Sequence, residues 1–264
     1  MDCCENTNFV LKNEILHPIY KYTKLYKCLN CFSYFFEKPN NFTEENFSKK
    51  YVEKSGDVFN INTNPNSSNF YSRRFFIDYS RFEIIRKYVN LKKKNNILEI
   101  GPGYPGLYPF FKELNQKYYV DESNINSIKL FKKDGVMNVR NNQISNLDLV
   151  ICNNVIYYFS DILSKLKQIK NSLKDNGLFF VDILNSKSLD DDYLKITDQV
   201  AIYSKHSIEF ILRSVGFNIL YSTLSSVYPP NDNIYYKRKF FNKVLNKFGL
   251  FTQSQVKNIL IKSV

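Results

Sequence analysis

A short apolar strand that runs directly into a glycine turn constrains this sequence more than any other feature. The segment reads Asn96-Ile-Leu-Glu-Ile-Gly-Pro-Gly-Tyr-Pro-Gly-Leu107. Gly101 and Gly103 have no Cβ, so the backbone can turn sharply there and approach a ligand closely. An acid, Glu99, lies two positions before the first glycine, near the carboxyl end of the strand, where ligands of open α/β sheets bind. The segment therefore predicts a nucleoside-cofactor site at the edge of an α/β sheet.

Two kinds of cofactor fit a turn of this type. Its glycine spacing matches the G-x-G-x-x-G dinucleotide fingerprint, and the pattern alone does not choose between NAD and S-adenosylmethionine. A diphosphate binds free backbone amides at a helix N-terminus, whereas Pro102, Pro105 and Pro109 remove three potential donors here. Because S-adenosylmethionine carries no phosphate and tolerates that loss better, the context favours S-adenosylmethionine.

The region from Ile97 to about Leu220 resembles the class I S-adenosylmethionine-dependent methyltransferases. Glu99-Ile-Gly-Pro-Gly103 matches the first half of the Glu/Asp-x-Gly-x-Gly-x-Gly motif of that family, and Pro105 followed by Gly106 stands at the third glycine. The resemblance implies a Rossmann-like, doubly wound α/β fold with a mostly parallel seven-stranded sheet. It also implies that Glu99, Gly101 and Gly103 bind the cofactor.

Further landmarks follow in the order of the family. Asp121 ends a β-rich run 22 positions after Glu99, where a carboxylate that accepts hydrogen bonds from ribose hydroxyls is expected. Leu147 to Asp161 resembles the fourth strand and its following loop. By that match, Asn153 and Asn154 lie beside the methionine end of the cofactor.

Candidate catalytic residues are few, because methyl transfer from a sulfonium mainly requires alignment of the nucleophile and exclusion of water. Tyr157 and Tyr158 stand where the family often carries Glu-His, so we expect either to orient an acceptor or to form the pocket wall. His206 is our first candidate for a general base. The alternative for His206 is a surface residue at a helix start.

Apolar spacing predicts the elements around these motifs. The spacing indicates helices over Arg73 to Leu91 and over residues 162 to 176, with Asn176-Gly177 as the stop signal of the second. Leu178 to Leu184 reads as a buried strand. Ser204 to Phe217 resembles the late helix of the family and its turn into a strand that ends at Ser222.

Four of the five cysteines lie in the first 31 residues: Cys3, Cys4, Cys28 and Cys31. Two thiolate pairs would complete the four-sulfur tetrahedron that structural zinc prefers. Residues 1–54 resemble the zinc-ribbon leader of many sugar and small-molecule methyltransferases, although the first pair is adjacent rather than Cys-x-x-Cys. The alternative is a decayed ribbon that holds no metal, with reduced cysteines.

The chain divides into four predicted parts. They are a zinc-ribbon-like lobe (1–54), a linker (55–72), the methyltransferase domain (73–228) and a basic helical C-terminal extension (229–264). The extension contains an amphipathic helix with lysines on its polar side. It either packs on the core or contacts a membrane or a partner.

Composition limits the functional classes only weakly. The 37 basic and 25 acidic side chains give a net charge of +12, but 30 of the basic residues are lysine. A coding sequence poor in G and C explains such a bias without any nucleic-acid partner. The start of the chain lacks a basic-plus-apolar leader, and no apolar run approaches the roughly 18 residues of a membrane span. We therefore expect a cytoplasmic protein.

Three functions remain open from the sequence. The leading hypothesis is a methyltransferase that acts on a small molecule, such as a nucleotide-linked sugar or a surface-glycan precursor, with O-methylation slightly favoured. The second is an RNA methyltransferase, for which the positive charge would serve as a docking surface. The third is a degenerate methyltransferase-fold protein that binds without turnover. The sequence does not predict the oligomeric state.

Overall fold

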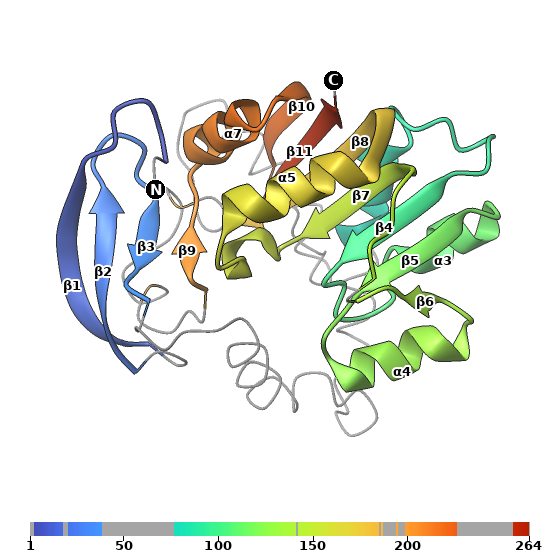
Figure 1. Cartoon of the computed structure of the whole chain (residues 1–264), viewed down its shortest axis with the longest axis horizontal. Helices are drawn as coiled ribbons and strands as arrows, with labels where there is room; N and C mark the ends of the chain where they lie inside the picture. The colour runs from blue at the N-terminus through green and yellow to red at the C-terminus, as the bar shows by residue number, and fades with distance from the viewer. Residues whose placement is uncertain are drawn as a thin grey trace, which may run out of the picture.

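The structure is a computed structural model of the whole chain, and it builds two sheets (Figure 1). The residues that it describes are 3–17, 21–38, 77–140, 142–184, 186, 194, 199–225 and 256–263. A seven-stranded sheet forms the main body, and a four-stranded sheet forms a smaller lobe at the N-terminus.

The main sheet has the strand order β10-β11-β8-β7-β4-β5-β6. Its strands are β4 (Asn96–Ile100), β5 (Lys117–Asp121), β6 (Met137–Asn138), β7 (Leu147–Asn153), β8 (Leu173–Leu184), β10 (Phe217–Ser225) and β11 (Val256–Ser263). The neighbours from β6 to β8 pair in parallel, whereas β11 pairs antiparallel with both β8 and β10. The predicted doubly wound, mostly parallel seven-stranded sheet is therefore confirmed.

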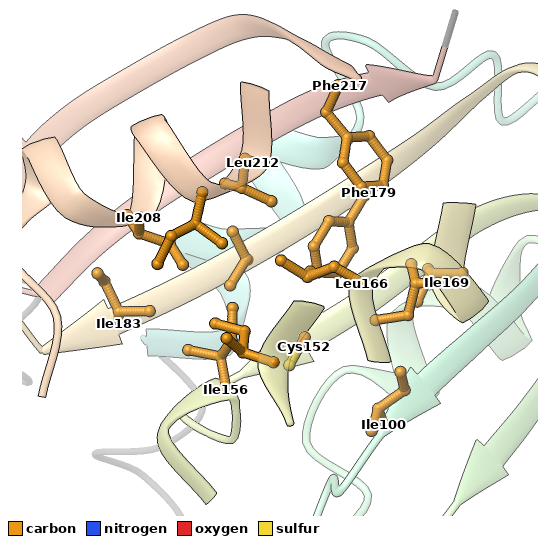
Figure 2. Close-up of a cluster of buried hydrophobic side chains, with 14 of the residues drawn as sticks. Ile100, Cys152, Ile156, Leu166, Ile169, Phe179, Ile183, Ile208, Leu212 and Phe217 are labelled. Atoms are coloured by element: carbon orange, nitrogen blue, oxygen red, sulfur yellow. The ribbon is translucent and has the colours of Figure 1, made fainter. Parts of the chain in front are cut away.

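Side chains alternate between the two faces of the sheet, and each face carries its own core. On one face, α5 (Ile162–Ser172) and α7 (Lys205–Ser214) pack on β7 and β8 through residues such as Leu166 and Ile208 (Figure 2). Cys152 is fully buried in this cluster, which agrees with a packing role.

The opposite face is covered by α3 (Tyr108–Glu113), α4 (Ile125–Lys133) and a helix described from residue 77 to residue 85. The last of these lies within the helix predicted over Arg73 to Leu91. Helices on both faces leave the central strands β4 and β7 buried, which is why these strands read as continuous apolar runs.

Side-chain caps fix the starts of the longer helices. Asp161 accepts a hydrogen bond from the amide of Ser164 at α5, and Ser204 does the same for Ser207 at α7. The sequence predicted that the first of these helices runs to residue 176. It ends at Ser172 instead, because Leu173 already pairs with Leu147 in the sheet.

The N-terminal lobe is joined to the main body by strand pairing. Its sheet has the order β1-β2-β3-β9, with β1 (Phe9–His17), β2 (Lys21–Cys28), β3 (Tyr34–Phe36) and β9 (Ala201–Ile202). β9 comes from the chain just before α7, and it lies beside β3 in Figure 1. The fourth strand of the lobe sheet is therefore supplied by the chain of the main body.

The C-terminal segment differs from the sequence prediction. Residues 256–263 form β11, a strand inside the main sheet, rather than part of a helical extension. The helix predicted within 229–264 and the linker predicted over 55–72 lie outside the described residues, so the four-part division stays a prediction. In the part of the chain that the structure describes, no helix is long and apolar enough to cross a membrane.

Candidate functional site

A cleft of about 1230 Å³ opens at the carboxyl ends of β4, β5 and β7. Most of the residues predicted for the cofactor site line it, and it extends to residues that the sequence did not single out, such as Arg140 and Lys165. The predicted residues in its wall are Gly101, Gly103, Asp121, Asn153, Asn154, Tyr157 and Tyr158. The site thus lies where ligands of open α/β sheets bind.

The glycine turn depends on its two glycines. Gly101 and Gly103 have φ angles of +58° and +68°, a region that residues with a Cβ rarely adopt. A Cβ on Gly101 would also lie 2.8 Å from Cγ2 of Val155. The amide of Gly101 donates to the carbonyl of Asp121 at 2.9 Å, which ties the turn to the end of β5.

Glu122 is a buried residue that the sequence analysis missed. Its carboxylate accepts hydrogen bonds from the amides of Gly103 (2.8 Å), Ser123 (2.7 Å) and Asn124 (2.7 Å). These bonds fix the path of the glycine turn against the loop after β5. The only signal for Glu122 in the sequence was its position directly after Asp121, the expected ribose ligand. That position alone does not indicate a role.

Glu99 does not line the cleft. It is 3% exposed, and its carboxylate accepts hydrogen bonds from the hydroxyl of Tyr118 (2.5 Å) and from Nδ2 of Asn153 (3.0 Å). Burial raises the pKa of Glu99 to about 7, although the hydrogen bond from Tyr118 acts in the opposite direction. The geometry therefore favours an indirect role over the direct cofactor contact that the sequence predicted.

Asp121 lies in the cleft at the end of β5, as the resemblance implied. Nζ of Lys165 lies 3.3 Å from its Oδ2, and Nη1 of Arg140 lies 3.8 Å from its Oδ1. Both cations are partly exposed, so neither pair removes the carboxylate from solvent. Asp121 remains able to accept hydrogen bonds from a ligand.

The two asparagines at the carboxyl end of β7 have different hydrogen-bond partners. Asn153 donates from Nδ2 to Glu99, and its Oδ1 is buried with no hydrogen-bond partner among the described residues. Asn154 has a φ of +54°, donates its amide to the carbonyl of Asp182 at 2.9 Å, and accepts from the hydroxyl of Tyr157 at 2.6 Å. Asn153 is thus held against Glu99, and Asn154 shapes the loop.

The candidate catalytic residues separate in the structure. Tyr157, in the 3-10 turn η1 (Ile156–Tyr158), is 1% exposed, and the amide of Leu184 lies 3.3 Å from its hydroxyl. Tyr158 lines the same cleft and is only partly buried. His206 is exposed at the second residue of α7 and is not among the described residues that line the cleft. This position gives no support to the predicted role of His206 as a base.

A buried cluster of charged side chains is hydrogen-bonded to the glycine turn through Tyr104. Arg81 is 1% exposed and donates to Asp78 (2.7 Å) and to Asp182 (2.6 Å), while the hydroxyl of Tyr104 donates to Asp78. Buried charges of this kind persist when they are paired. The sequence analysis missed the cluster because its members are up to 104 positions apart in the chain.

The four N-terminal cysteines meet in one buried cluster. All four Sγ atoms lie within 4.8 Å of one another, with 3.3 Å between Cys3 and Cys31 and 3.7 Å between Cys4 and Cys28. Sulfurs about 2.3 Å from a tetrahedral zinc are about 3.8 Å apart, so the donor set and spacing fit zinc. The hydrogen bond from Cys3 lowers the pKa of Cys31 to about 4, which favours a thiolate ligand.

A family comparison identifies the main body. Residues 73–222 match the model of a methyltransferase domain. The chain belongs to this methyltransferase family. The recognition of the chain as a class I S-adenosylmethionine-dependent methyltransferase is therefore confirmed.

Individual proteins resemble the chain more distantly. A tRNA U34 carboxymethyltransferase from Campylobacter lari is 27% identical over 199 residues, which cover 67% of this chain and 66% of the relative. The chain thus spans just under two thirds of the length of that curated relative.

Solved structures confirm the fold. A magnesium protoporphyrin IX methyltransferase from Synechocystis, with bound S-adenosylhomocysteine, superposes with a TM-score of 0.58 at 12% identity, over 84% of this chain and all of that one. A methyltransferase from Archaeoglobus fulgidus gives a TM-score of 0.55 at 16% identity, over 72% and 94% of the two chains.

The residues at the cleft fit an S-adenosyl nucleoside. The glycine turn leaves no room for a Cβ at Gly101, and the carboxylate of Asp121 is partly exposed in the cleft. The turn carries two prolines beside its glycines, which suits a cofactor without a diphosphate.

Proposed function

We propose that the chain transfers a methyl group from S-adenosylmethionine to a small molecule of the nucleotide-linked sugar class, at a hydroxyl oxygen. The observation that carries the proposal is the size of the cleft. At about 1230 Å³ it is larger than the roughly 300–1,000 Å³ of sites that hold one drug-sized ligand. The cleft therefore has room for a cofactor and a small acceptor together.

The residues of the cleft divide the binding of the cofactor between them. In this proposal Gly101 and Gly103 let the backbone approach the nucleoside, and Asp121 accepts hydrogen bonds from the ribose hydroxyls. Asn153 and Asn154 flank the methionine end. When bound, S-adenosylmethionine supplies an activated methyl group on a sulfonium, so the chain has to align the acceptor and exclude water.

The acceptor side of the site is assigned to Tyr158. Tyr157 uses its hydroxyl on Asn154, which makes it part of the wall, whereas Tyr158 is only partly buried. Arg140 and Lys165 line the cleft and give it positive charge beside Asp121. Positive charge there supports an acceptor that carries phosphates.

A second candidate is a tRNA substrate. It is favoured by the relative from Campylobacter lari, which is named a tRNA U34 carboxymethyltransferase, and by the net charge of +12. Phosphate contacts to RNA depend steeply on salt. Transfer to tRNA that falls steeply between low and physiological salt would support this candidate.

The experiment is a labelled-methyl transfer assay with a panel of nucleotide-linked sugars, the corresponding free sugars, and tRNA. We expect transfer to at least one nucleotide-linked sugar. The variant Arg140→Gln should raise the KM for that acceptor and leave the KM for S-adenosylmethionine nearly unchanged. Transfer to tRNA alone would replace the small-molecule proposal by the second candidate.

A further inference from the structure

We propose that Glu122 is a specificity-determining residue of the cleft. Its carboxylate occupies backbone amides that a diphosphate would need, and it thereby excludes dinucleotide cofactors such as NAD. The inference goes beyond the proposed function, because it concerns the cofactor that the cleft excludes rather than the acceptor that it binds. A turn whose glycine spacing fits both cofactors would in this way discriminate between them.

Glu122 holds its carboxylate at the cleft wall. It follows Asp121 at the end of β5, lines the cleft and is 5% exposed. Its Oε2 accepts from the amide of Gly103 at 2.8 Å, and its Oε1 accepts from the amides of Ser123 and Asn124 at 2.7 Å each. Acceptance at both oxygens is the pattern of an ionised carboxylate, which has no proton to donate. Backbone donors from two loops therefore fix a negative charge beside the glycine turn.

The amide of Gly103 is the donor on which the discrimination depends. In the dinucleotide fingerprint, the second glycine is the one that lets the backbone approach the pyrophosphate. Gly103 is the second glycine of this turn, and its amide already donates to Glu122. A diphosphate at the turn would either displace the carboxylate from its donors or lie beside it. The first leaves a buried charge without partners, and the second brings like charges together, so both oppose binding.

The helices next to the turn offer little replacement for that donor. A diphosphate binds free amides at a helix N-terminus. At the start of α4, Oδ1 of Asn124 accepts from the amides of Asn126 (2.9 Å) and Ser127 (3.2 Å). The helix after the glycine turn, α3, has Pro109 in its first turn and therefore one donor fewer. The chain thus uses these backbone donors for its own side chains.

The cations of the cleft lie on a different carboxylate. Arg140 and Lys165 pair with Asp121, and in the part of the chain that the structure describes no lysine or arginine pairs with Glu122. The charge of Glu122 is therefore not offset by a neighbouring cation. Phosphate is attracted near Arg140 and Lys165 and repelled near the turn, which suits a cofactor without phosphate.

The test compares two adenosine ligands that differ at the 5′ position. 5′-methylthioadenosine carries a neutral thioether there, and ADP carries a diphosphate. In calorimetry with the unmodified protein, ADP should bind at least about 10-fold more weakly than 5′-methylthioadenosine. Glu122→Gln removes the charge and should bring the two affinities to within about threefold of each other. The exposed Glu113→Gln, which removes the same charge elsewhere, should leave the difference unchanged.

A second variant probes the amides themselves. Glu122→Ala leaves the amides of Gly103, Ser123 and Asn124 without their acceptor, in a space that held a carboxylate. Acetate should bind there in place of the side chain. Compared with chloride at the same ionic strength, we expect acetate to raise the affinity of Glu122→Ala for S-adenosylhomocysteine by about threefold or more. It should not change the affinity of the unmodified protein.

The outcomes distinguish this inference from the proposed function. Equal affinities of the unmodified protein for the two adenosine ligands, or a difference that persists in Glu122→Gln, would overturn the role of Glu122 and leave the proposed function standing. If Glu122→Gln does not fold, the acetate effect on Glu122→Ala decides, and its absence would overturn the role. Failure of the unmodified protein to bind S-adenosylhomocysteine or 5′-methylthioadenosine would overturn the proposed function, and the inference with it.

Discussion

Glu99 is a buried titratable group on a central strand of the main sheet. Burial raises its pKa to about 7, so the folded protein binds the proton more tightly than the unfolded chain does. The tighter binding of the proton stabilises the folded protein. This contribution is complete at pH values below the pKa of Glu99 in the unfolded chain, and it is lost as the pH rises through about 7, the pKa of Glu99 in the folded protein.

The raised pKa of Glu99 therefore makes the free energy of unfolding depend on pH. Between pH 4.5 and 7.5 we expect Glu99 to lower the free energy of unfolding by about 3 kcal/mol, because one pKa unit corresponds to about 1.4 kcal/mol. Glu99→Gln should remove this slope. Urea unfolding at both pH values measures it, with the exposed Glu113→Gln as control. Identical slopes for the protein and Glu99→Gln would contradict the assignment.

The predicted contact between Asp121 and the ribose can be tested by substitution. Asp121→Asn should weaken the binding of S-adenosylhomocysteine by about 10-fold or more if the carboxylate accepts from the ribose. The free energy of unfolding should change by no more than about 1 kcal/mol, because its ion pairs are partly exposed. Calorimetry and urea unfolding report the two quantities. Equal losses in both would show that Asp121 is structural.

The residues of the site illustrate what sequence reasoning can reach. The glycine turn and Asp121 were predictable because motif spacing fixes them along the chain. The indirect position of Glu99 was not predicted, because it depends on the face of β4: Leu98 and Ile100 line the cleft, and the side chain between them points to the other face. Glu122 and Arg81 were missed because each has a partner from a distant segment of the chain, Gly103 for Glu122 and Asp182 for Arg81.

At the scale of elements, the strands of the central sheet could be predicted from continuous apolar runs, since both of their faces are buried. β11 could not. Its sequence, Val256-Lys-Asn-Ile-Leu-Ile-Lys-Ser263, is short and carries lysines, and the sequence analysis assigned it to a helical extension. Only pairing with β8 and β10, which come much earlier in the chain, makes it a strand of the main sheet.

The position of β11 predicts a strong effect of truncation. Deletion of residues 256–264 would remove the strand between β8 and β10 and expose an unpaired edge on β8. We expect the shortened chain to lose its cooperative unfolding transition or to aggregate. Circular dichroism with thermal unfolding measures this. A truncated chain with an unchanged transition would contradict the placement of β11 in the sheet.

In the molecule as a whole, the cysteine cluster and the cleft are connected through β9, the strand of the lobe sheet that comes from the main-body chain. The hydroxyl of Ser33 lies 3.3 Å from Sγ of Cys31 and accepts from the amide of Ser204, the N-cap of α7. β3 pairs with β9, and the amide of Val200 donates to the carbonyl of Tyr157 in the cleft wall. We therefore expect the metal site to stabilise the main body as well as the lobe.

Metal analysis tests this connection. Purified protein should contain about one zinc per chain, and Cys28→Ser should lower that content sharply, because three thiolates hold zinc less tightly than four. Cys152→Ala, which changes a cysteine buried in the other core, should keep the zinc. Removal of zinc by a chelator should lower the melting temperature. A content far below one zinc per chain would contradict the zinc assignment.

Binding of S-adenosylmethionine in the cleft can be measured by calorimetric titration of the purified protein with S-adenosylmethionine and, separately, with NAD. We predict saturable binding of S-adenosylmethionine at one site per chain and no binding of NAD. Absence of S-adenosylmethionine binding at millimolar concentration, or preferential binding of NAD, would contradict this prediction.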